Sequence, residues 1–92
     1  MRLSDAVTIE LQRLADNGNS VPLTFGVQTS PGRRLVTLEV IALLNPRPLV
    51  AQLRPGMAFG ALSFQTRMRL AASQTVWTVA TLDNGERIGT MT

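Results

Sequence analysis

Residues 75–92 have the pattern of a β-hairpin, and this pattern constrains the fold more than any other part of the chain. The first arm is rich in threonine, valine and tryptophan, and Asp83-Asn84-Gly85 separates it from the second arm. A three-residue loop with Gly85 as a left-handed bulge would pair Trp77 with Met91. We favour this loop over a two-residue one, because the shorter loop would set the like charges of Asp83 and Glu86 opposite each other.

Further strands are predicted upstream from the alternation of apolar and polar residues. In residues 21–27, apolar side chains alternate with proline, threonine and glycine, which predicts a half-buried strand. Pro22 lies at its start, where an edge strand tolerates proline. Residues 35–44 are apolar on nearly both faces, which favours a central strand covered on both sides, although a helix stays open. Residues 58–72 alternate for so long that we expect a bend near Gly60 or Thr66.

Turn chemistry separates these segments. Ser30-Pro31-Gly32-Arg33 suits a type II turn, because proline and glycine take the two central positions. Asn45-Pro46-Arg47-Pro48 is a firm break, and Arg54-Pro55-Gly56 marks another turn. Residues 49–53 between them form a short segment of open type.

The N-terminal segment is expected to form a helix. Ser4 can cap a helix that runs to about Asn17 and ends at Gly18. An apolar stripe at helical spacing supports it, formed by Leu3, Val7, Leu11 and Leu14. The β-branched run Val7-Thr8-Ile9 also alternates as a strand would, and Ile9 would lie on the polar side of the helix, where it could touch a partner.

These segments predict a mainly β fold of the α+β class. We expect a small antiparallel β-barrel or sandwich of five to six strands with one N-terminal helix. One domain would span residues 1–92, with the helix in 1–18 and the β-rich body in 21–92.

The chain contains no histidine, cysteine, tyrosine or lysine, and this removes most catalytic chemistry. Without these residues it has no imidazole base, no thiolate and no amine nucleophile. We therefore expect no enzyme, no cofactor and no metal site. Glu39 stands out because it lies in an apolar strand. It is either a buried acid–base group or a structural carboxylate that pairs with an arginine, and we favour the second.

All nine basic residues are arginines, which accounts for the sequence pI of about 11.5 at a net charge of only +3. If the chain meanders, Arg33, Arg34 and Arg54 lie in turns at one end of the sheet. Arg67 and Arg69 would project from one strand face. Arginine suits both phosphate and carboxylate partners. Candidate interface or anion contacts are therefore Arg33, Arg34, Arg54, Arg67, Arg69, Ile9, Phe59 and Trp77.

The high apolar content of 45%, against 16% charged residues, suggests that a partner covers part of the surface. We therefore predict a non-catalytic structural or adaptor protein that acts through protein–protein contacts, in a homo-oligomer or in a phage particle or secretion machine. The alternative is an arginine-based nucleic-acid-binding module. With no apolar signal-peptide core and no apolar run longer than residues 40–44, we expect a cytoplasmic protein or part of a particle assembled there, with no membrane span.

A second alternative comes from a resemblance. Leu53-Arg54-Pro55-Gly56, a short apolar segment and a closing hairpin that ends at residues 87–92 resemble the surface-presentation-of-antigens fold. This resemblance implies a small intertwined β dimer of the kind found in type III secretion and flagellar switch complexes.

Overall fold

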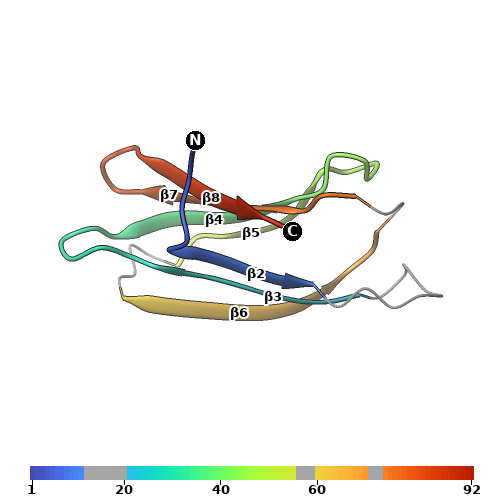
Figure 1. Ribbon diagram of the computed structural model, residues 1–92, viewed down its shortest axis with the longest axis horizontal. Coiled ribbons are helices and arrows are strands. Elements are labelled where there is room, and N and C mark those ends of the chain that lie inside the picture. The colour runs from blue at the N-terminus through green and yellow to red at the C-terminus, as the bar shows by residue number, and fades with distance from the viewer. Residues whose placement is uncertain (12–20, 56–59, 71–73) are drawn as a thin grey trace.

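The computed structural model describes residues 1–11, 21–55, 60–70 and 74–92. Within these residues, eight strands form two sheets that pack face to face (Figure 1). The strands are β1 (Arg2–Leu3), β2 (Val7–Leu11), β3 (Val21–Gln28), β4 (Leu35–Ile41), β5 (Leu49–Leu53), β6 (Ala61–Met68), β7 (Trp77–Leu82) and β8 (Arg87–Met91). One sheet has the order β1-β8-β7-β4-β5 and the other the order β2-β3-β6. The mainly β prediction is confirmed, as a two-layer arrangement without a closed barrel and with more strands than expected.

The core lies between the two sheets, and the alternation of the strands builds it. Val21, Leu23, Phe25 and Val27 of β3 are all buried, as the pattern predicts. The ring of Phe25 lies opposite that of Phe64 on β6, with ring centroids 5.8 Å apart. From the other sheet, buried side chains of β4, β7 and β8 complete the core: Leu35, Leu38, Val40, Ala80, Leu82 and Ile88.

The predicted N-terminal helix is wrong. Residues 7–11 form strand β2, which pairs antiparallel with β3 so that Val7 faces Val27 and Ile9 faces Phe25. The β-branched residues and their period-two alternation prevail over the helical stripe, because the strand register places Val7, Ile9 and Leu11 on the core side. Residues 12–18, the rest of the expected helix, lie outside the described residues.

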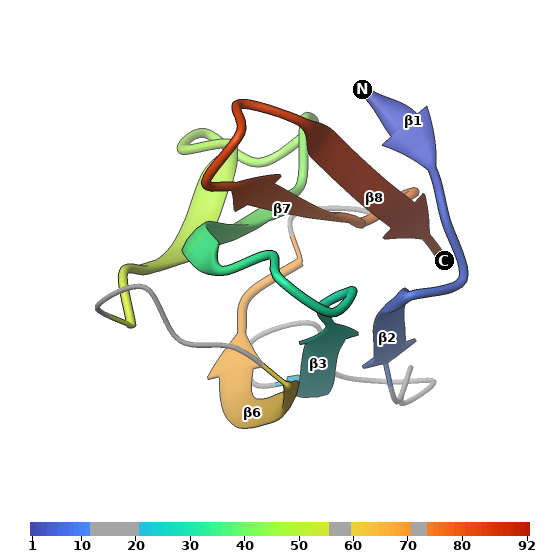
Figure 2. The ribbon, with the colours of Figure 1, turned by 90° about the vertical axis from the view of Figure 1, so that its left-hand side faces the viewer.

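Ser4 stabilises a turn instead of capping the expected helix. Its Oγ accepts a hydrogen bond from the backbone N–H of Ala6 at 3.1 Å, which is the local hydroxyl turn that competes with helix formation. This turn carries the chain from β1, which runs parallel to β8, into β2 of the other sheet (Figure 2).

The hairpin forms with the three-residue loop. Trp77 pairs with Met91, the N–H of Leu82 donates to the carbonyl of Glu86 at 2.9 Å, and Gly85 has a φ of 85°. The type II turn also forms, with the N–H of Arg33 donating to the carbonyl of Ser30 at 3.0 Å. Local turn chemistry was therefore sufficient to predict both connections.

Two of the longer predicted segments form strands that are shorter than expected. The apolar segment 35–44 is a strand only to Ile41, and as predicted it lies inside its sheet, between β7 and β5. The long segment 58–72 provides β6, which begins directly after Gly60, whose φ of 91° marks a bend.

The sandwich is elongated, with extents of 43 × 21 × 19 Å, and its connections gather at the two ends (Figure 1). One end carries the loops 29–34 and 83–86, and the N–H of Asp83 donates to the carbonyl of Arg34 across them at 3.0 Å. The opposite end carries the loop 42–48.

Candidate functional site

A pocket of about 480 Å³ opens beside the loop 29–34, at the end of the sandwich that also holds the β7–β8 hairpin. Two of the predicted arginines, Arg33 and Arg34, line it. Its remaining lining consists of Gln28, Thr29, Ser30, Pro31, Gly32 and Gly60. The pocket is therefore built almost entirely from one turn and its anchor.

Thr29 fixes this turn to the start of β6. Thr29 is buried, and its hydroxyl accepts a hydrogen bond from the N–H of Gly60 at 2.7 Å. In return, the N–H of Thr29 donates to the carbonyl of Gly60 at 3.0 Å. These two hydrogen bonds hold the backbone of the arginine-bearing turn in place, so the side chains of Arg33 and Arg34 extend from a fixed position.

The two arginines of the pocket are engaged to different degrees. Arg33 forms a loose ion pair with Asp83, with Nη1 and Oδ1 3.6 Å apart, and nearly half of its side chain stays exposed. Arg34 is exposed and makes a contact of its own in the folded chain. A loose, half-exposed pair can exchange its carboxylate for an incoming anion at small cost.

The remaining predicted arginines do not join this pocket. Arg54 follows β5 at the same end of the sheet, as expected from the meander. Arg67 lines a separate hollow of about 420 Å³ on the outer face of the three-stranded sheet, together with Glu10, Thr24 and Gln65. Arg69 follows β6 at the opposite end of the sandwich. The arginines thus form no continuous stripe along the described residues.

Glu39 is a structural carboxylate. Its side chain is half-buried and lies 3.9 Å from the guanidinium of Arg87. The side-chain amide of Gln52, its neighbour on β5, donates a hydrogen bond to it at 3.4 Å. These partners agree with the favoured interpretation, a carboxylate that pairs with an arginine.

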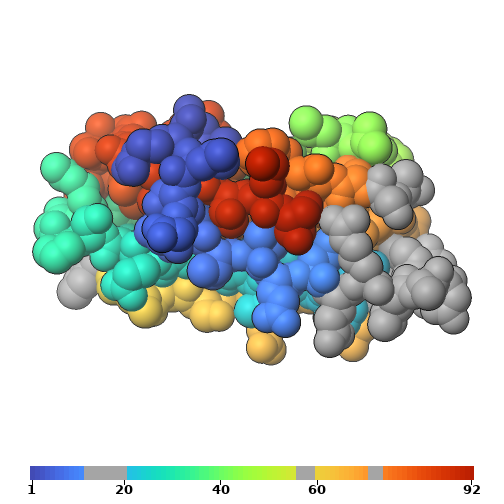
Figure 3. All heavy atoms as spheres, in the orientation of Figure 1, coloured from blue at the N-terminus to red at the C-terminus, as the bar shows by residue number. Residues whose placement is uncertain are grey.

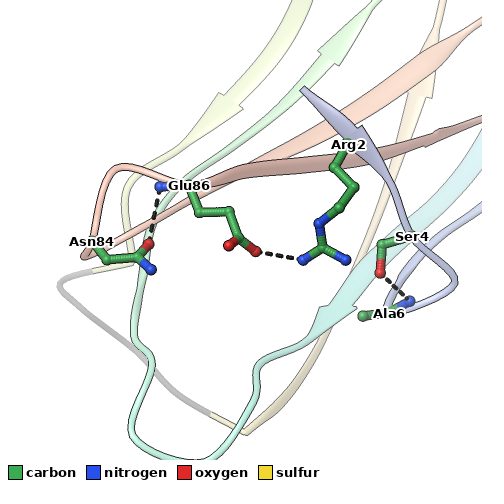
Figure 4. Close-up of polar contacts among 5 residues, drawn as sticks. All are labelled: Arg2, Ser4, Ala6, Asn84 and Glu86. Carbon is green, nitrogen blue, oxygen red and sulfur yellow. Dashed lines mark hydrogen bonds and ion pairs between the residues drawn. The ribbon is translucent and has the colours of Figure 1, made fainter.

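The N-terminal strand is tied to the hairpin by surface polar contacts (Figure 4). Arg2 of β1 forms an ion pair with Glu86, and the side chain of Asn84 accepts a hydrogen bond from the N–H of Glu86 at 2.9 Å. Both partners of the ion pair are largely exposed, so it orients β1 more than it stabilises the fold.

The three apolar residues predicted as interface contacts differ in where they lie. Ile9 is half-buried against the core, which follows from its place on β2, so it is not an exposed contact. Phe59 lies outside the described residues. Trp77 is half-buried on β7 and faces Ile41 on one side and Met91 on the other.

Sequence reasoning missed the exposed leucines at the far end of the sandwich. Leu43 and Leu44 are 67% and 64% exposed, and Leu49 is 46% exposed. Leu43 and Leu44 were assigned to the strand 35–44, which in fact ends at Ile41. The Asn45-Pro46 break directly after them was the signal that could have moved them into the loop.

Neither a metal cluster nor a membrane span is found in the described part of the chain. Its acidic residues form no group of three or more that could hold a metal ion. No helix of transmembrane length and hydropathy occurs among residues 1–11, 21–55, 60–70 and 74–92.

Comparison with known proteins matches the chain to one family model and to solved structures. A family model described as "Sulfur oxidation protein SoxY" matches residues 1–91. Among solved structures, the sulfur carrier protein SoxY from Chlorobium limicola f thiosulfatophilum superposes with a TM-score of 0.78 at 22% identity, covering 99% of this chain and 78% of that chain. At this identity the structural likeness establishes the fold. No curated protein matches.

These matches overturn the functional prediction from sequence. The chain matches a sulfur oxidation family over 91 residues, so its assignment to a phage particle or secretion machine was wrong. The same match contradicts the two alternatives, a nucleic-acid-binding module and a dimer of the surface-presentation-of-antigens fold. Small β-rich chains of similar composition serve many functions, which is why fold-level reasoning chose the wrong setting.

Proposed function

Because the chain belongs to the SoxY family of sulfur oxidation proteins, we propose that it takes part in the oxidation of reduced sulfur compounds as a carrier-type binding domain and not as an enzyme. The family match over residues 1–91 carries this proposal. The solved relative with the same fold is described as a sulfur carrier protein, which favours a binding role. A carrier also has to meet other proteins, so the proposal includes a protein partner.

The residue chemistry supports a role without catalysis. The chain has no imidazole, thiol or amine to move protons or attack substrate. Three of its carboxylates are in ion pairs, since Glu39 faces Arg87, Asp83 faces Arg33 and Glu86 faces Arg2. These carboxylates are therefore occupied by structural partners.

Covalent sulfur transport would need a group that these residues lack. A protein carries sulfur covalently as a persulfide or a related cysteine derivative, which forms on a thiolate. Residues 1–92 contain no cysteine. Within this chain, sulfur would therefore be held by non-covalent contacts.

The pocket beside the 29–34 turn suits such contacts. Oxidised sulfur compounds such as sulfite and thiosulfate are anions, and planar guanidinium groups pair well with oxyanions. Arg33 and Arg34 line the pocket, and Arg33 is held only loosely by Asp83. We therefore assign the pocket a sulfur oxyanion as its ligand.

Amide shifts in the NMR spectrum test the binding step. Thiosulfate is titrated into ¹⁵N-labelled protein, with chloride at equal ionic strength as the reference. We expect shifts concentrated at residues 28–34 and 60, and their loss in the double variant Arg33→Ala, Arg34→Ala. The matched control is Arg69→Ala at the opposite end, which should bind as the unaltered protein does. Shifts that chloride reproduces fully would rule out the assigned ligand.

Growth experiments test the pathway assignment separately. Cells that lack the chain should oxidise a reduced sulfur compound more slowly than the parent strain, and the intact gene should restore the rate. Equal rates in both strains would sink the assignment to sulfur oxidation, whatever the pocket binds.

A further inference from the structure

An apolar row crosses the outer face of the five-stranded sheet. The register places Leu49 beside Ile41, Ile41 beside Trp77, and Trp77 beside Met91, across β5, β4, β7 and β8. Register partners project from the same face of a sheet. Val40 and Val76, the chain neighbours of Ile41 and Trp77, belong to the inner cluster, so this row faces outward.

The loop 42–48 extends this row. It rises on the outer side of the five-stranded sheet, away from the β2-β3-β6 layer (Figures 1 and 2), and it stands out as a protrusion in the space-filling view (Figure 3). Leu43 and Leu44 lie in this loop and are largely exposed. We call Leu43, Leu44, Leu49, Ile41, Trp77 and Met91 the leucine–tryptophan surface.

The loop is held in shape from beneath. The N–H of Ala42 donates to the carbonyl of Pro48 at 2.8 Å, which closes the loop on itself. The buried side chain of Gln74 accepts a hydrogen bond from the N–H of Leu44 at 2.9 Å and donates one to the side chain of Asn45 at 3.0 Å. Asn45 also donates to the carbonyl of Arg69 at 2.7 Å. The leucines are therefore exposed on a preorganised backbone, which lowers the entropy cost of binding.

The charged side chains of the segment that contains the loop 42–48 are all positive. Residues 40–82 contain four arginines and no aspartate or glutamate. Arg47 lies in the loop beside the leucines, and no ion pair among the described residues includes it. Glu39 projects from the neighbouring row, but Arg87 and Gln52 engage it. The rim nearest the leucines therefore has an uncompensated positive charge.

We propose that the leucine–tryptophan surface docks a partner protein whose contact area is apolar at its centre and carries carboxylates opposite Arg47. Aromatic and apolar anchors surrounded by arginine are typical of the centre of a protein interface. An anionic membrane is the poorer fit, because stable attraction to its surface needs a cluster of roughly four to eight basic residues. The loop supplies Arg47 alone.

Trp77 provides a direct probe. It is the only tryptophan and the chain has no tyrosine, so the chain's own tryptophan fluorescence comes from this surface alone once the emission of the partner is subtracted. Proteins cross-linked to the chain in cells that oxidise reduced sulfur are identified by mass spectrometry, purified and titrated singly against it. The inference rests on the proposed function only in this choice of cells. Docking should shift Trp77 emission to the blue and protect it from acrylamide quenching.

Surface variants locate the contact. The double variant Leu43→Ser, Leu44→Ser should weaken binding about tenfold or more, because exposed apolar anchors dominate such interfaces. The backbone N–H of Leu44 still reaches Gln74 in this variant, so the loop keeps its anchor. Arg47→Glu should weaken binding more than Arg47→Gln. The control Gln65→Ser lies on the outer face of the other sheet and should bind normally.

Each contrary result overturns the inference. A partner that binds without changing Trp77 emission, and binds the variants equally well, would place the interface elsewhere. A shift caused by anionic phospholipid vesicles alone would make the surface a membrane contact. A shift that grows with protein concentration alone would make the occupant a second copy. None of these results depends on the growth of cells that lack the chain. Failure of this inference can therefore be distinguished from failure of the proposed function.

Discussion

Gly26 on β3 approaches the backbone of Leu62 on β6 so closely that no side chain fits between them. A Cβ atom on Gly26 would overlap the carbonyl oxygen of Leu62 and would lie 3.3 Å from the Cα atom of Ser63. Gly26 is the register partner of Ser63, in a ladder that runs the full length of both strands. The two strands that form the floor of the sandwich therefore depend on glycine at this position.

Gly26→Ala is expected to lower the free energy of unfolding by about 1–3 kcal/mol, because the backbone of β3 or β6 has to move to admit the methyl group. Urea denaturation measures the change. The control is Ser63→Ala, an exposed change on the facing strand, which should alter stability by less than about 0.5 kcal/mol. Equal midpoints for the two variants would contradict the close approach.

Gln74→Ala is expected to destabilise the protein by about 1–3 kcal/mol, because the N–H of Leu44 and the side chain of Asn45 lose a buried partner. Hydrogen exchange at the Leu44 amide should accelerate at the same time. Gln52→Ala makes a matched comparison, since Gln52 is exposed and its bond to Glu39 is long, at 3.4 Å. If Leu44 exchanges at an unchanged rate, Gln74 does not anchor the loop.

Gly85 has a left-handed φ of 85°, and a β-branched residue there is expected to cost about 1–2 kcal/mol. Gly85→Val should therefore unfold at a lower urea concentration than Gly85→Asn, because asparagine tolerates this region. Apart from its two chain neighbours, no residue has an atom within 4 Å of the position that a Cβ would take at Gly85, so the difference reflects the backbone conformation more than crowding. Variants of equal stability would argue against the bulged loop.

Incubation with polysulfide is expected to leave the intact mass of residues 1–92 unchanged, because the chain has no thiolate on which a persulfide can form. The control is Ser63→Cys, which places an exposed thiol on β6 and should gain the mass of added sulfur. A mass gain in the chain without cysteine would show that another group holds sulfur covalently.

Turns and the strand pairing next to them were predictable from sequence, down to single pairs of residues. The Asp83-Asn84-Gly85 loop and its Trp77–Met91 pair, and the turn at residues 30–33, form as their sequences predict. Each depends on a few neighbouring residues with fixed conformational preferences. The turn also places Arg33 and Arg34 together, but no sequence pattern predicted the pocket that they line.

Long-range choices were not predictable in this way. Residues 7–11 satisfy a helical stripe and a strand alternation equally well, and only the pairing of β2 with β3 selects the strand. The exposed leucines were missed because the Asn45-Pro46 break shows only that the strand must end before it, and not that β4 ends at Ile41. Its end is set by β5 and β7, whose strands pair with it from later in the chain.

Local preferences along the chain specify the turns, the alternation of most strands and the available chemistry, which lacks thiol, imidazole and amine side chains. These properties belong to single residues or to neighbours in the chain. Which strands share a sheet and which residues share a face depend on contacts between segments that are distant in the chain. Leu49, Ile41, Trp77 and Met91 come from four strands and meet in one row only because hydrogen-bonded register brings distant segments together.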